Sequence, residues 1–563
     1  MYLDVLVKIP DVKGKITRKQ KGNSIYINYE YGRKYDPDRR FNIPQRATIG
    51  KQSKADPSTM QPNQNYLMYF PGETIPDKKY NSDRCSLLRI GTHIVIDRII
   101  QGYHLREMLG NYFERDLGLL LDLAAYSIIM ENNAGQYYPD YAYNHALFTD
   151  DMRMYSDSKV SDFLRYITPD KSVEFLNEWN GGRNHKEKIY ISYDSTNKNC
   201  QAGDLEMAEF GHAKVDIGAP IVNISMAYDT ANKVPLFYEE YPGSINDVAQ
   251  FQCMVAKAKG YGYRNIGFIL DRGYFAKDNI EYMDACGYSF VMMTKGMSAF
   301  VSSMILDIKG TFEDKRDNSI YDYSVYGTTV KKKLYVTDKK DRYFHIYHNP
   351  YKEAKEREKV EEKITKIQKL LNRQIGCEFE VSDAIEQYFE LIFGKDGKLA
   401  AFREKKEVIE REIRLCGYFV IVTSDKMKAD EAIHLYKSRD TSEKLFSSDK
   451  SFLGNRSFRT HSDESTSGKI FVEFVAVIIR CRLYTCLKAE AERLDSKPNY
   501  MTVPAAIKEL EKIEMIRGYD NVYRLDHAVT ATQKTILGAF NLTENDVKKA
   551  ARSISDRLAA VRG

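Results

Sequence analysis

The hydrophobic pattern near the start of the chain changes from that of strands to that of helices. Residues 23–35 alternate apolar and polar positions, which predicts strands, and Asp36-Pro37-Asp38 predicts a turn. Residues 105–180 have helical spacing instead, most clearly over 116–130 and over 158–167, which ends before Pro169. We therefore expect a strand-rich region over 1–104 and a helical region over 105–185. Short helices near 152–180 fit a helix-turn-helix, although plain helical packing is the commoner explanation of such a pattern.

From residue 186 the pattern is that of a mixed α/β domain. Strand-like segments at 188–196, 220–229 and 233–243 precede a helix over 245–258, and a strand over 266–273, a helix over 276–285 and a strand over 288–296 follow. Three strands, a helix, a strand, a helix and a strand resemble the order of an RNase H-like domain. The predicted fold class is therefore α/β, with an RNase H-like core.

The α/β pattern is interrupted over residues 297–416. Strand-like pieces at 319–328, 331–337 and 342–348 precede charged helical runs over 353–374 and 400–415, whose mixture of Lys and Glu is typical of solvated helix faces. A strand at 417–425, a helix at 429–446 and an apolar helix at 468–486 follow. We expect a core in two parts, 186–296 and 417–496, around an inserted β-plus-helix domain. Residues 497–563 form a C-terminal helical unit, with helices near 503–516 and 543–560.

Composition narrows the class of protein. The chain has 563 residues, of which 43% are hydrophobic and 12% aromatic, and this excludes a disordered or fibrous protein. Eight cysteines without a CxxC pair fit reduced thiols. The opening residues have no signal-peptide pattern, and the most apolar stretches, 117–130 and 470–479, are too short to span a bilayer. We expect a soluble, cytoplasmic protein without a membrane partner.

Positive charge is concentrated at the start of the chain. The formal net charge of the whole chain is +5, but residues 1–54 carry thirteen Lys or Arg against five acids, a balance of +8, and the remainder sums to −3. A basic, strand-rich module with interleaved tyrosines is typical of a DNA-binding region. A solvated basic surface explains the same charges, and charge alone does not decide between the two.

Two aspartates stand where predicted buried strands end. Asp194 closes the segment YISYD, and Asp271 follows GFIL directly. A carboxylate at the end of an apolar strand is costly unless something compensates its charge. If the two strands are neighbours, the carboxylates converge, and a divalent cation would relieve their repulsion. Oxygen ligands without a Cys or His cluster favour Mg²⁺ or Mn²⁺ over zinc. Taken singly, each aspartate could instead cap a turn.

The most specific pattern is a spaced motif in HLYKSRDTSEKLFSSDK. It contains Tyr436, Arg439, Glu443 and Lys450 with the spacing Y-x2-R-x3-E-x6-K. On one continuous helix, Tyr436 and Glu443 would lie two turns apart on one face with Arg439 beside them. Lys450 shares that face only if the helix continues through residues 447–449. Arg439 and Glu443 could also form a simple surface ion pair.

Other candidate residues carry weaker signals. His212 and His461 fit ordinary structural histidines better than ligands of DNA or metal. Arg272, next to Asp271, could contact a phosphate or form a structural ion pair, and Glu464 is a less convincing third carboxylate than Glu443 because it lies outside the motif. The phosphate-binding patterns GxxxxGK[ST] and strand-borne GxGxxG are missing, so ATP use is not expected.

Together these motifs resemble the DDE transposases of bacterial insertion sequences, and more narrowly the insertion-sequence-four superfamily with its Tyr-Arg-Glu-Lys signature. The segments YDSTN, ILDRGYF and GYFVIVTSD resemble the motif blocks of that family. In that superfamily an inserted domain separates the second Asp from the Glu, which accommodates residues 297–416. The resemblance covers about 186–490 well and the basic start more loosely.

The resemblance implies a DNA transposase that binds the terminal inverted repeats of its element, cuts there and joins the ends to target DNA. Asp194, Asp271 and Glu443 would be catalytic and would hold two divalent ions, Mg²⁺ or Mn²⁺. Tyr436, Arg439, Lys450 and Arg272 would bind DNA. A homodimer on paired ends and a cytoplasmic, nucleoid-associated location in bacteria are implied as well. An RNase H-like nuclease that does not join, or an inactive DNA-binding repressor, are the alternatives. The only tryptophan, Trp179, precedes the first catalytic strand and receives no role in stacking a flipped base.

Overall fold

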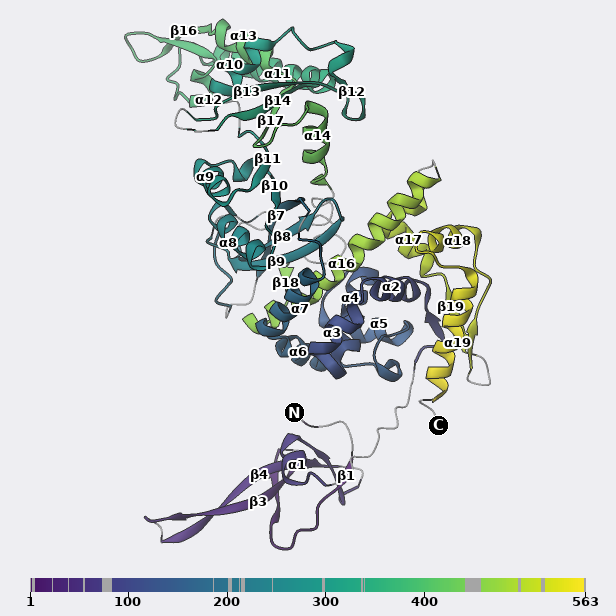
Figure 1. Cartoon of the computed structure of the whole chain (residues 1–563). Coiled ribbons are helices and arrows are strands. Elements are labelled where there is room, and N and C mark those ends of the chain that lie inside the picture. Colours follow the sequence, from purple (N-terminus) through teal and green to yellow (C-terminus); the bar gives the residue numbers. More distant parts are fainter. Residues whose placement is uncertain are drawn as a thin grey trace. The chain divides into compact units, whose positions relative to one another are not determined.

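The structure is a computed structural model whose described part forms two compact units, Met1–Arg84 with Ser555–Gly563 and Cys85–Ile554 (Figure 1). It describes all residues except 1, 3–5, 23, 39, 54–55, 73–83, 186, 201–204, 212, 214–217, 246, 296–298, 336–337, 339, 441–456, 495–497, 518–521 and 561–563, and the side chains of 247, 248 and 560.

The N-terminal unit is an antiparallel sheet in the order β1-β5-β4-β3-β2 with one short helix. Ile27, Ile49, Met60 and Tyr66 lie at the centre of its small apolar core. The strand pattern predicted over 23–35 is confirmed by β3, and in the turn that follows the Asp38 backbone amide donates to Asp36 Oδ1 over 3.0 Å. Its elements are β1 (Val7–Lys8), β2 (Ile16–Lys21), β3 (Ser24–Asp36), β4 (Phe41–Gln52), β5 (Thr59–Pro62) and α1 (Gln64–Tyr69).

Helices fill the segment that the sequence predicted to be helical, and α2 begins before that segment, at Gly91. Its most apolar segment, α4, is buried continuously from Leu119 to Ile128, as expected of a helix that is hydrophobic all round. It packs on the long helix α16 (Asp463–Arg493), which also contacts α6, whereas α7 packs on α3. Among the described residues, no helix is both long and apolar enough to cross a membrane. The helices are α2 (Gly91–Gly102), α3 (Leu105–Phe113), α4 (Leu117–Met130), α5 (Tyr138–Asn144), α6 (Asp157–Tyr166) and α7 (Pro169–Gly181).

The second unit is built on one large mixed sheet, which confirms the α/β class. In the order β9-β8-β7-β10-β11, β8 runs antiparallel to both of its neighbours β9 and β7, whereas β10 and β11 run parallel to β7. Strands and helices alternate as the hydrophobic pattern predicts. The elements are β7 (Ile189–Cys200), β8 (Ile221–Asp229), β9 (Val234–Pro242), α8 (Asp247–Gly260), β10 (Ile266–Leu270), α9 (Lys277–Cys286) and β11 (Ser289–Met293).

The same sheet continues beyond β11 with strands from the interrupting segment. β17 (Tyr418–Thr423) runs antiparallel to β11, and β14 (Arg342–His348), β13 (Val325–Lys332) and β12 (Ser319–Ile320) follow outward. The pieces predicted at 319–328 and 342–348 therefore extend the sheet of the α/β core. A separate strand beginning at 331 is wrong, because residues 331–332 end β13, which pairs with β14 continuously from Tyr326 to Lys332. Helix α10 (Ala299–Ile308) precedes them, at a place where the pattern indicated no element.

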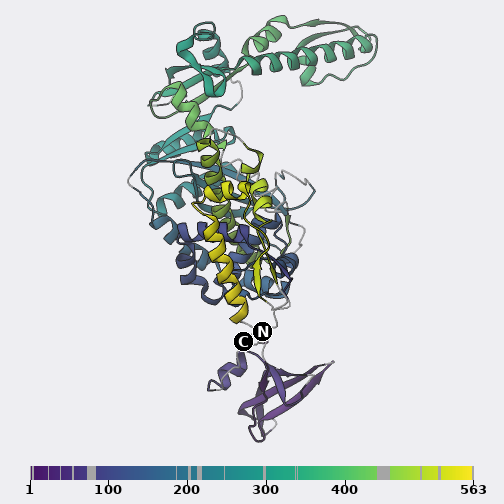
Figure 2. The ribbon, with the colours of Figure 1, turned by 90° about the vertical axis from the view of Figure 1, so that its right-hand side faces the viewer.

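The rest of the segment forms an arm with its own apolar core, around Ile364, Leu371 and Tyr388. Figure 2 shows the arm from the side, with α11 as its longest helix. A helical run over 400–415 was expected, but residues 399–404 form a strand because they pair with β15, where Phe402 packs edge-on against Phe389. The arm consists of α11 (Pro350–Gln374), α12 (Asp383–Glu386), β15 (Phe389–Phe393), β16 (Leu399–Glu404) and α13 (Lys406–Leu415).

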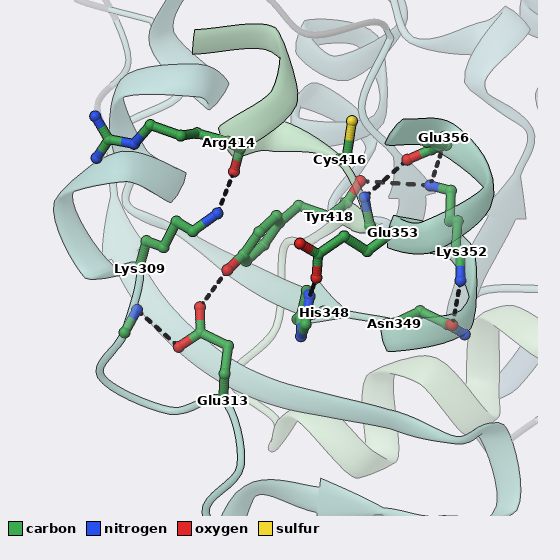
Figure 3. A network of polar contacts seen from close by, with 12 residues as sticks. Lys309, Glu313, His348, Asn349, Lys352, Glu353, Glu356, Arg414, Cys416 and Tyr418 are labelled. Atoms are coloured by element: carbon green, nitrogen blue, oxygen red, sulfur yellow. Dashed lines mark hydrogen bonds and ion pairs between the residues drawn. The ribbon is translucent and has the colours of Figure 1, made fainter. Parts of the chain in front are cut away.

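Polar contacts fasten the two ends of this arm to the sheet (Figure 3). The backbone N–H of Asn349 donates to the Gly417 carbonyl over 3.0 Å, and the backbone N–H of Gly417 donates to Glu356 Oε2 over 2.8 Å. His348 Nε2 lies 2.7 Å from Glu353 Oε2. The arm thus leaves and rejoins the sheet at one hydrogen-bonded point.

The C-terminal residues pair with a strand that precedes the helical region. β6 (Leu87–Arg89) forms a three-stranded antiparallel sheet with β19 (Glu514–Arg517) and β20 (Tyr523–Leu525). The helix expected over 503–516 ends at Leu510, because residues 514–517 pair with β6 as a strand. The other helices are α17 (Val503–Leu510), α18 (Ala531–Gly538) and α19 (Glu544–Ala560), the last as expected near 543–560.

Candidate active site

Asp194 and Asp271 lie at the same level of two neighbouring parallel strands. The register pairs Leu270 of β10 with Tyr193 of β7, so the next residue of each strand is an aspartate. Asp271 keeps an extended backbone, with φ −71° and ψ 161°. Neighbouring strands are about 4.8 Å apart, and residues at one level of a parallel pair face the same side. The sheet therefore brings together the two carboxylates that the sequence predicted to converge.

Backbone amides orient both carboxylates. The Ser195 amide donates to Asp194 Oδ1 over 2.9 Å, and the Arg272 amide donates to Asp271 Oδ1 over 2.6 Å. Asp194 is half-buried, and 42% of the Asp271 side chain is exposed. N–H donors stabilise the ionised form of a carboxylate. The site thus presents two oriented carboxylates at a solvent-accessible edge of the sheet.

Arg439 reaches this edge from a segment distant in sequence. Its Nη1 lies 3.4 Å from Asp271 Oδ1, and only 10% of its side chain is exposed. Its guanidinium carbon lies 5.3 Å from the centroid of the Tyr436 ring. Tyr436 is buried in an apolar cluster with Ile269 and Ile433, which anchors α14 (Ala429–Lys437) on the sheet. Three of the residues singled out in the sequence therefore meet here: Asp271, Tyr436 and Arg439.

The helix that carries the spaced motif is shorter than expected. A continuous helix over 429–446 is wrong, because α14 ends at Lys437. The Arg439 amide donates to the Tyr436 carbonyl over 3.2 Å, and the Ser438 hydroxyl donates to the Leu435 carbonyl over 2.6 Å. These three-residue contacts tighten and end the last turn. Arg439 therefore approaches Asp271 from a turn, while Glu443 and Lys450 lie outside the described residues.

The remaining candidates lie in varied surroundings. Arg272 is exposed on the turn after Asp271, and His461 is exposed before α16. Glu464 is exposed in the first turn of α16, where hydrogen bonds from its own amide and from Ser462 hold its carboxyl pKa low. Trp179 is buried and donates its indole N–H to the Pro235 carbonyl over 2.9 Å, which is a structural role. His212 lies outside the described residues.

The donor set fits a hard divalent cation. Two carboxylates at one edge supply the oxygen ligands that Mg²⁺ and Mn²⁺ prefer. Within the described ranges, no three His, Cys, Asp or Glu side chains are grouped to hold a metal ion. Glu443, the third carboxylate of the sequence prediction, falls in the gap at 441–456.

A buried ionic cluster behind the same strand was not expected. Lys198, four residues after Asp194 on β7, places its Nζ 2.7 Å from Glu473 Oε2, with side-chain exposures of 1% and 5%. Asn133 donates to the other Glu473 oxygen over 3.0 Å. Burial lowers the pKa of neighbouring Lys469 to about 8, although Glu473 opposes the shift. A Glu inside the apolar run 470–479 was the signal for this cluster, since buried charges are normally paired.

The chain matches the family described as transposase DDE domain over residues 194–479, which is half of its length, and it belongs to that family. The match begins at Asp194 and includes Asp271 and Arg439. The family is named for transposases, enzymes that cleave and transfer DNA and generally use divalent metal ions.

A solved structure of the piggyBac transposase synaptic complex with hairpin DNA also resembles the chain. The identity is 8% and the TM-score 0.31, over 73% of this chain and 66% of that one. The chain therefore spans just under two thirds of that transposase. No curated protein matches the chain.

Proposed function

We propose that this transposase binds the terminal inverted repeats of an insertion sequence, cuts the DNA at these ends and joins them to a target. The observation that carries the proposal is the placement of Asp194 and Asp271 at one level of neighbouring strands, with Arg439 next to Asp271. Within the family, the Tyr436, Arg439, Glu443 and Lys450 spacing supports membership of the insertion-sequence-four superfamily.

The strand order supports an RNase H-like core. In the order β9-β8-β7-β10-β11, the antiparallel strands β7, β8 and β9 come first along the chain. The next two strands, β10 and β11, run parallel to β7. In this proposal the core comprises 186–296 and 417–496, and 297–416 is the inserted segment, whose first strands lengthen the sheet. Residues 1–104 form the DNA-binding region, 105–185 the helical region and 497–563 the C-terminal unit.

Asp194, Asp271 and Glu443 would hold two divalent ions, Mg²⁺ or Mn²⁺. When bound, such ions activate a water or a 3′-hydroxyl for in-line attack on a phosphate and stabilise the leaving oxygen. The amides of Ser195 and Arg272 orient the two carboxylates. No side chain has to act as a nucleophile in this chemistry.

The basic residues of the site would hold the DNA backbone. The Arg439 guanidinium lies within 3.4 Å of Asp271, so a phosphate bound beside these carboxylates would meet a planar, charged donor. Tyr436 positions that arginine from the apolar cluster under α14 and would contribute to DNA contact through it. Arg272, exposed beside Asp271, and Lys450 would contact further phosphates. Paired DNA ends would be held by a homodimer in the bacterial nucleoid.

A joining assay separates this proposal from its alternatives. DNA that carries an uncut element end next to flanking sequence, labelled on the element side, is incubated with the full chain, target plasmid and Mg²⁺, so that cleavage and joining are both scored. Labelled plasmid is the expected product, and Glu443→Gln should abolish it, whereas Glu410→Gln on exposed α13 should not. Cleavage without joining would favour the nuclease, and binding without cleavage would favour the repressor.

A further inference from the structure

The N-terminal sheet extends into a two-stranded ribbon (Figure 1). β3 and β4 pair from Tyr26 and Lys51 to Asp36 and Phe41. β2 pairs with β3 only as far as Tyr29, and β5 pairs with β4 only from Gly50. Residues 30–36 and 41–47 therefore pair only with each other among the described strands. At about 3.3 Å per residue, this ribbon is roughly 23 Å long.

One face of the ribbon carries two arginines held by one carboxylate. Glu30 Oε1 accepts a hydrogen bond from Arg33 Nε over 2.8 Å, and Glu30 Oε2 lies 3.4 Å from an Arg46 terminal nitrogen. Only 8% of the Glu30 side chain is exposed, against 65% for Arg33 and 45% for Arg46. A buried anion therefore fixes two guanidinium groups that face solvent.

The same face presents further groups suited to DNA bases. The register places Tyr35 opposite Asn42 and Arg33 opposite Pro44, and Tyr35 is 58% exposed. Arginine pairs with the O6 and N7 edge of guanine, and asparagine pairs with the N6 and N7 edge of adenine. Glu30 accepts from one nitrogen of each guanidinium, and a guanidinium has five N–H donors. Lys34 points to the opposite face, because alternate residues of a strand face opposite sides.

We propose that this face of the ribbon enters the major groove of duplex DNA and reads its sequence through Arg33, Arg46 and Asn42. The major groove is about 12 Å wide and admits a two-stranded ribbon. The balance of +8 over residues 1–54 attracts the polyanion. Glu30 is a positioning residue, since it acts through the arginines. This inference rests on the proposed function for one point, which is that the DNA sequence preferred by the ribbon is the end of the element.

Selection from a random duplex library with the full chain tests this directly. The wild type should enrich one motif, and Arg33→Ala with Arg46→Ala should reduce the preference for that motif over a scrambled duplex by at least about tenfold. Lys34→Ala, a neighbouring charge on the opposite face, should retain the preference. Replacing guanine by 7-deazaguanine in the motif should weaken wild-type binding, because it removes a major-groove acceptor.

Two further variants distinguish sequence recognition from general charge attraction and from loss of folding. Arg33→Lys keeps the charge but loses the planar fork, so it should retain affinity for scrambled duplex and lose preference. Glu30→Gln should lose preference while its affinity for scrambled duplex rises, because one negative charge is removed. The melting temperature of each variant shows whether the unit stays folded.

The proposal is overturned if the wild type enriches no motif, or if the double arginine variant enriches the same motif as strongly as Lys34→Ala does. Failure of the proposed function gives a different result. Asp194 lies outside the N-terminal unit, so Asp194→Asn should leave motif selection unchanged. If the wild type selects a motif but cleaves no DNA, the transposition reaction is refuted and the ribbon assignment still stands.

Discussion

Arg439 lies 3.4 Å from Asp271, with its guanidinium mostly buried and the carboxylate partly exposed. A fixed positive charge beside a carboxylate opposes binding of a cation there, and it favours binding of a phosphate. The same arginine therefore has opposite effects on the two ligands that we expect at this edge of the sheet.

Arg439→Gln should change the metal requirement and the rate in opposite senses. We expect half-maximal cleavage at a lower Mg²⁺ concentration, because the repulsion is removed, and a maximal rate lower by about ten- to a hundredfold, because a phosphate contact is lost. Cleavage measured across a Mg²⁺ titration gives both values. Lys437→Gln removes a charge at the end of α14 and is the control. Equal changes in the two variants would contradict the account.

Glu473 should be needed for stability rather than for chemistry. Glu473→Gln leaves the Lys198 ammonium in a buried site without its anion, which costs about 3–5 kcal/mol. The matched control is Glu362→Gln, whose pair with Lys366 has 59% and 77% exposed side chains and should cost less than about 1 kcal/mol. Thermal unfolding of the full chain measures both. Similar melting temperatures for the two variants would show that the buried pair contributes little.

The buried Lys469 predicts a pH-dependent stability. Its pKa in the folded chain is about 8, below the ordinary 10.5, because burial disfavours the ammonium. The unfolded chain therefore binds more protons between these values, and this lysine makes the folded state more stable as pH rises through that window. The wild type should gain about 2 kcal/mol relative to Lys469→Met between pH 7.5 and 9.5.

Urea unfolding of both proteins at the two pH values measures this difference. Other groups, such as the Cys481 thiol, whose pKa is raised by burial, titrate in both proteins and cancel in the comparison. A difference that stays constant or falls with pH would refute the assignment.

Gly417 should be irreplaceable where the arm rejoins the sheet. Its φ is +84°, and a Cβ there would lie 2.7 Å from the Glu353 Cβ and 2.9 Å from the Asn349 carbonyl oxygen. Gly376 has φ +83° with no atom within 4 Å of such a Cβ. Gly376→Ala should cost about 1 kcal/mol of backbone strain, and Gly417→Ala at least about 2 kcal/mol more.

Limited proteolysis of the arm and thermal unfolding report these two costs. Faster cleavage within 350–416 is expected for Gly417→Ala alone. Equal behaviour of the two variants would mean that the joint relaxes around the new methyl group.

Much of the α/β core was predictable because its signals are local. Apolar runs marked β7 and β10, and turn residues separated them from the helices. Because these strands are parallel neighbours, residues at the same level face the same side of the sheet, and Asp194 and Asp271 therefore converge. The apolar helices α4 and α16 were evident for the same reason.

The features that were missed depend on contacts between distant segments. Nothing local in residues 418–423 indicates that β17 runs antiparallel to β11, or that β14 and β13 continue that sheet. The strand at 399–404 exists because β15 pairs with it. The motif helix was extended through residue 446 on periodicity, but three-residue hydrogen bonds end α14 at Lys437. The Arg439 contact with Asp271 depends on that turn.

Cleavage of end DNA in Mg²⁺ by the wild type, Asp194→Asn and Asp271→Asn tests the central claim most directly. Each substitution keeps the shape of the side chain and removes a charged metal ligand. Asp278→Asn, an exposed carboxylate on α9, is the matched control. We predict cuts at the inverted repeats that require Mg²⁺, fall by at least about a thousandfold in both site variants and persist in the control. Undiminished cleavage by Asp194→Asn or by Asp271→Asn would contradict the assignment of these carboxylates as the catalytic pair.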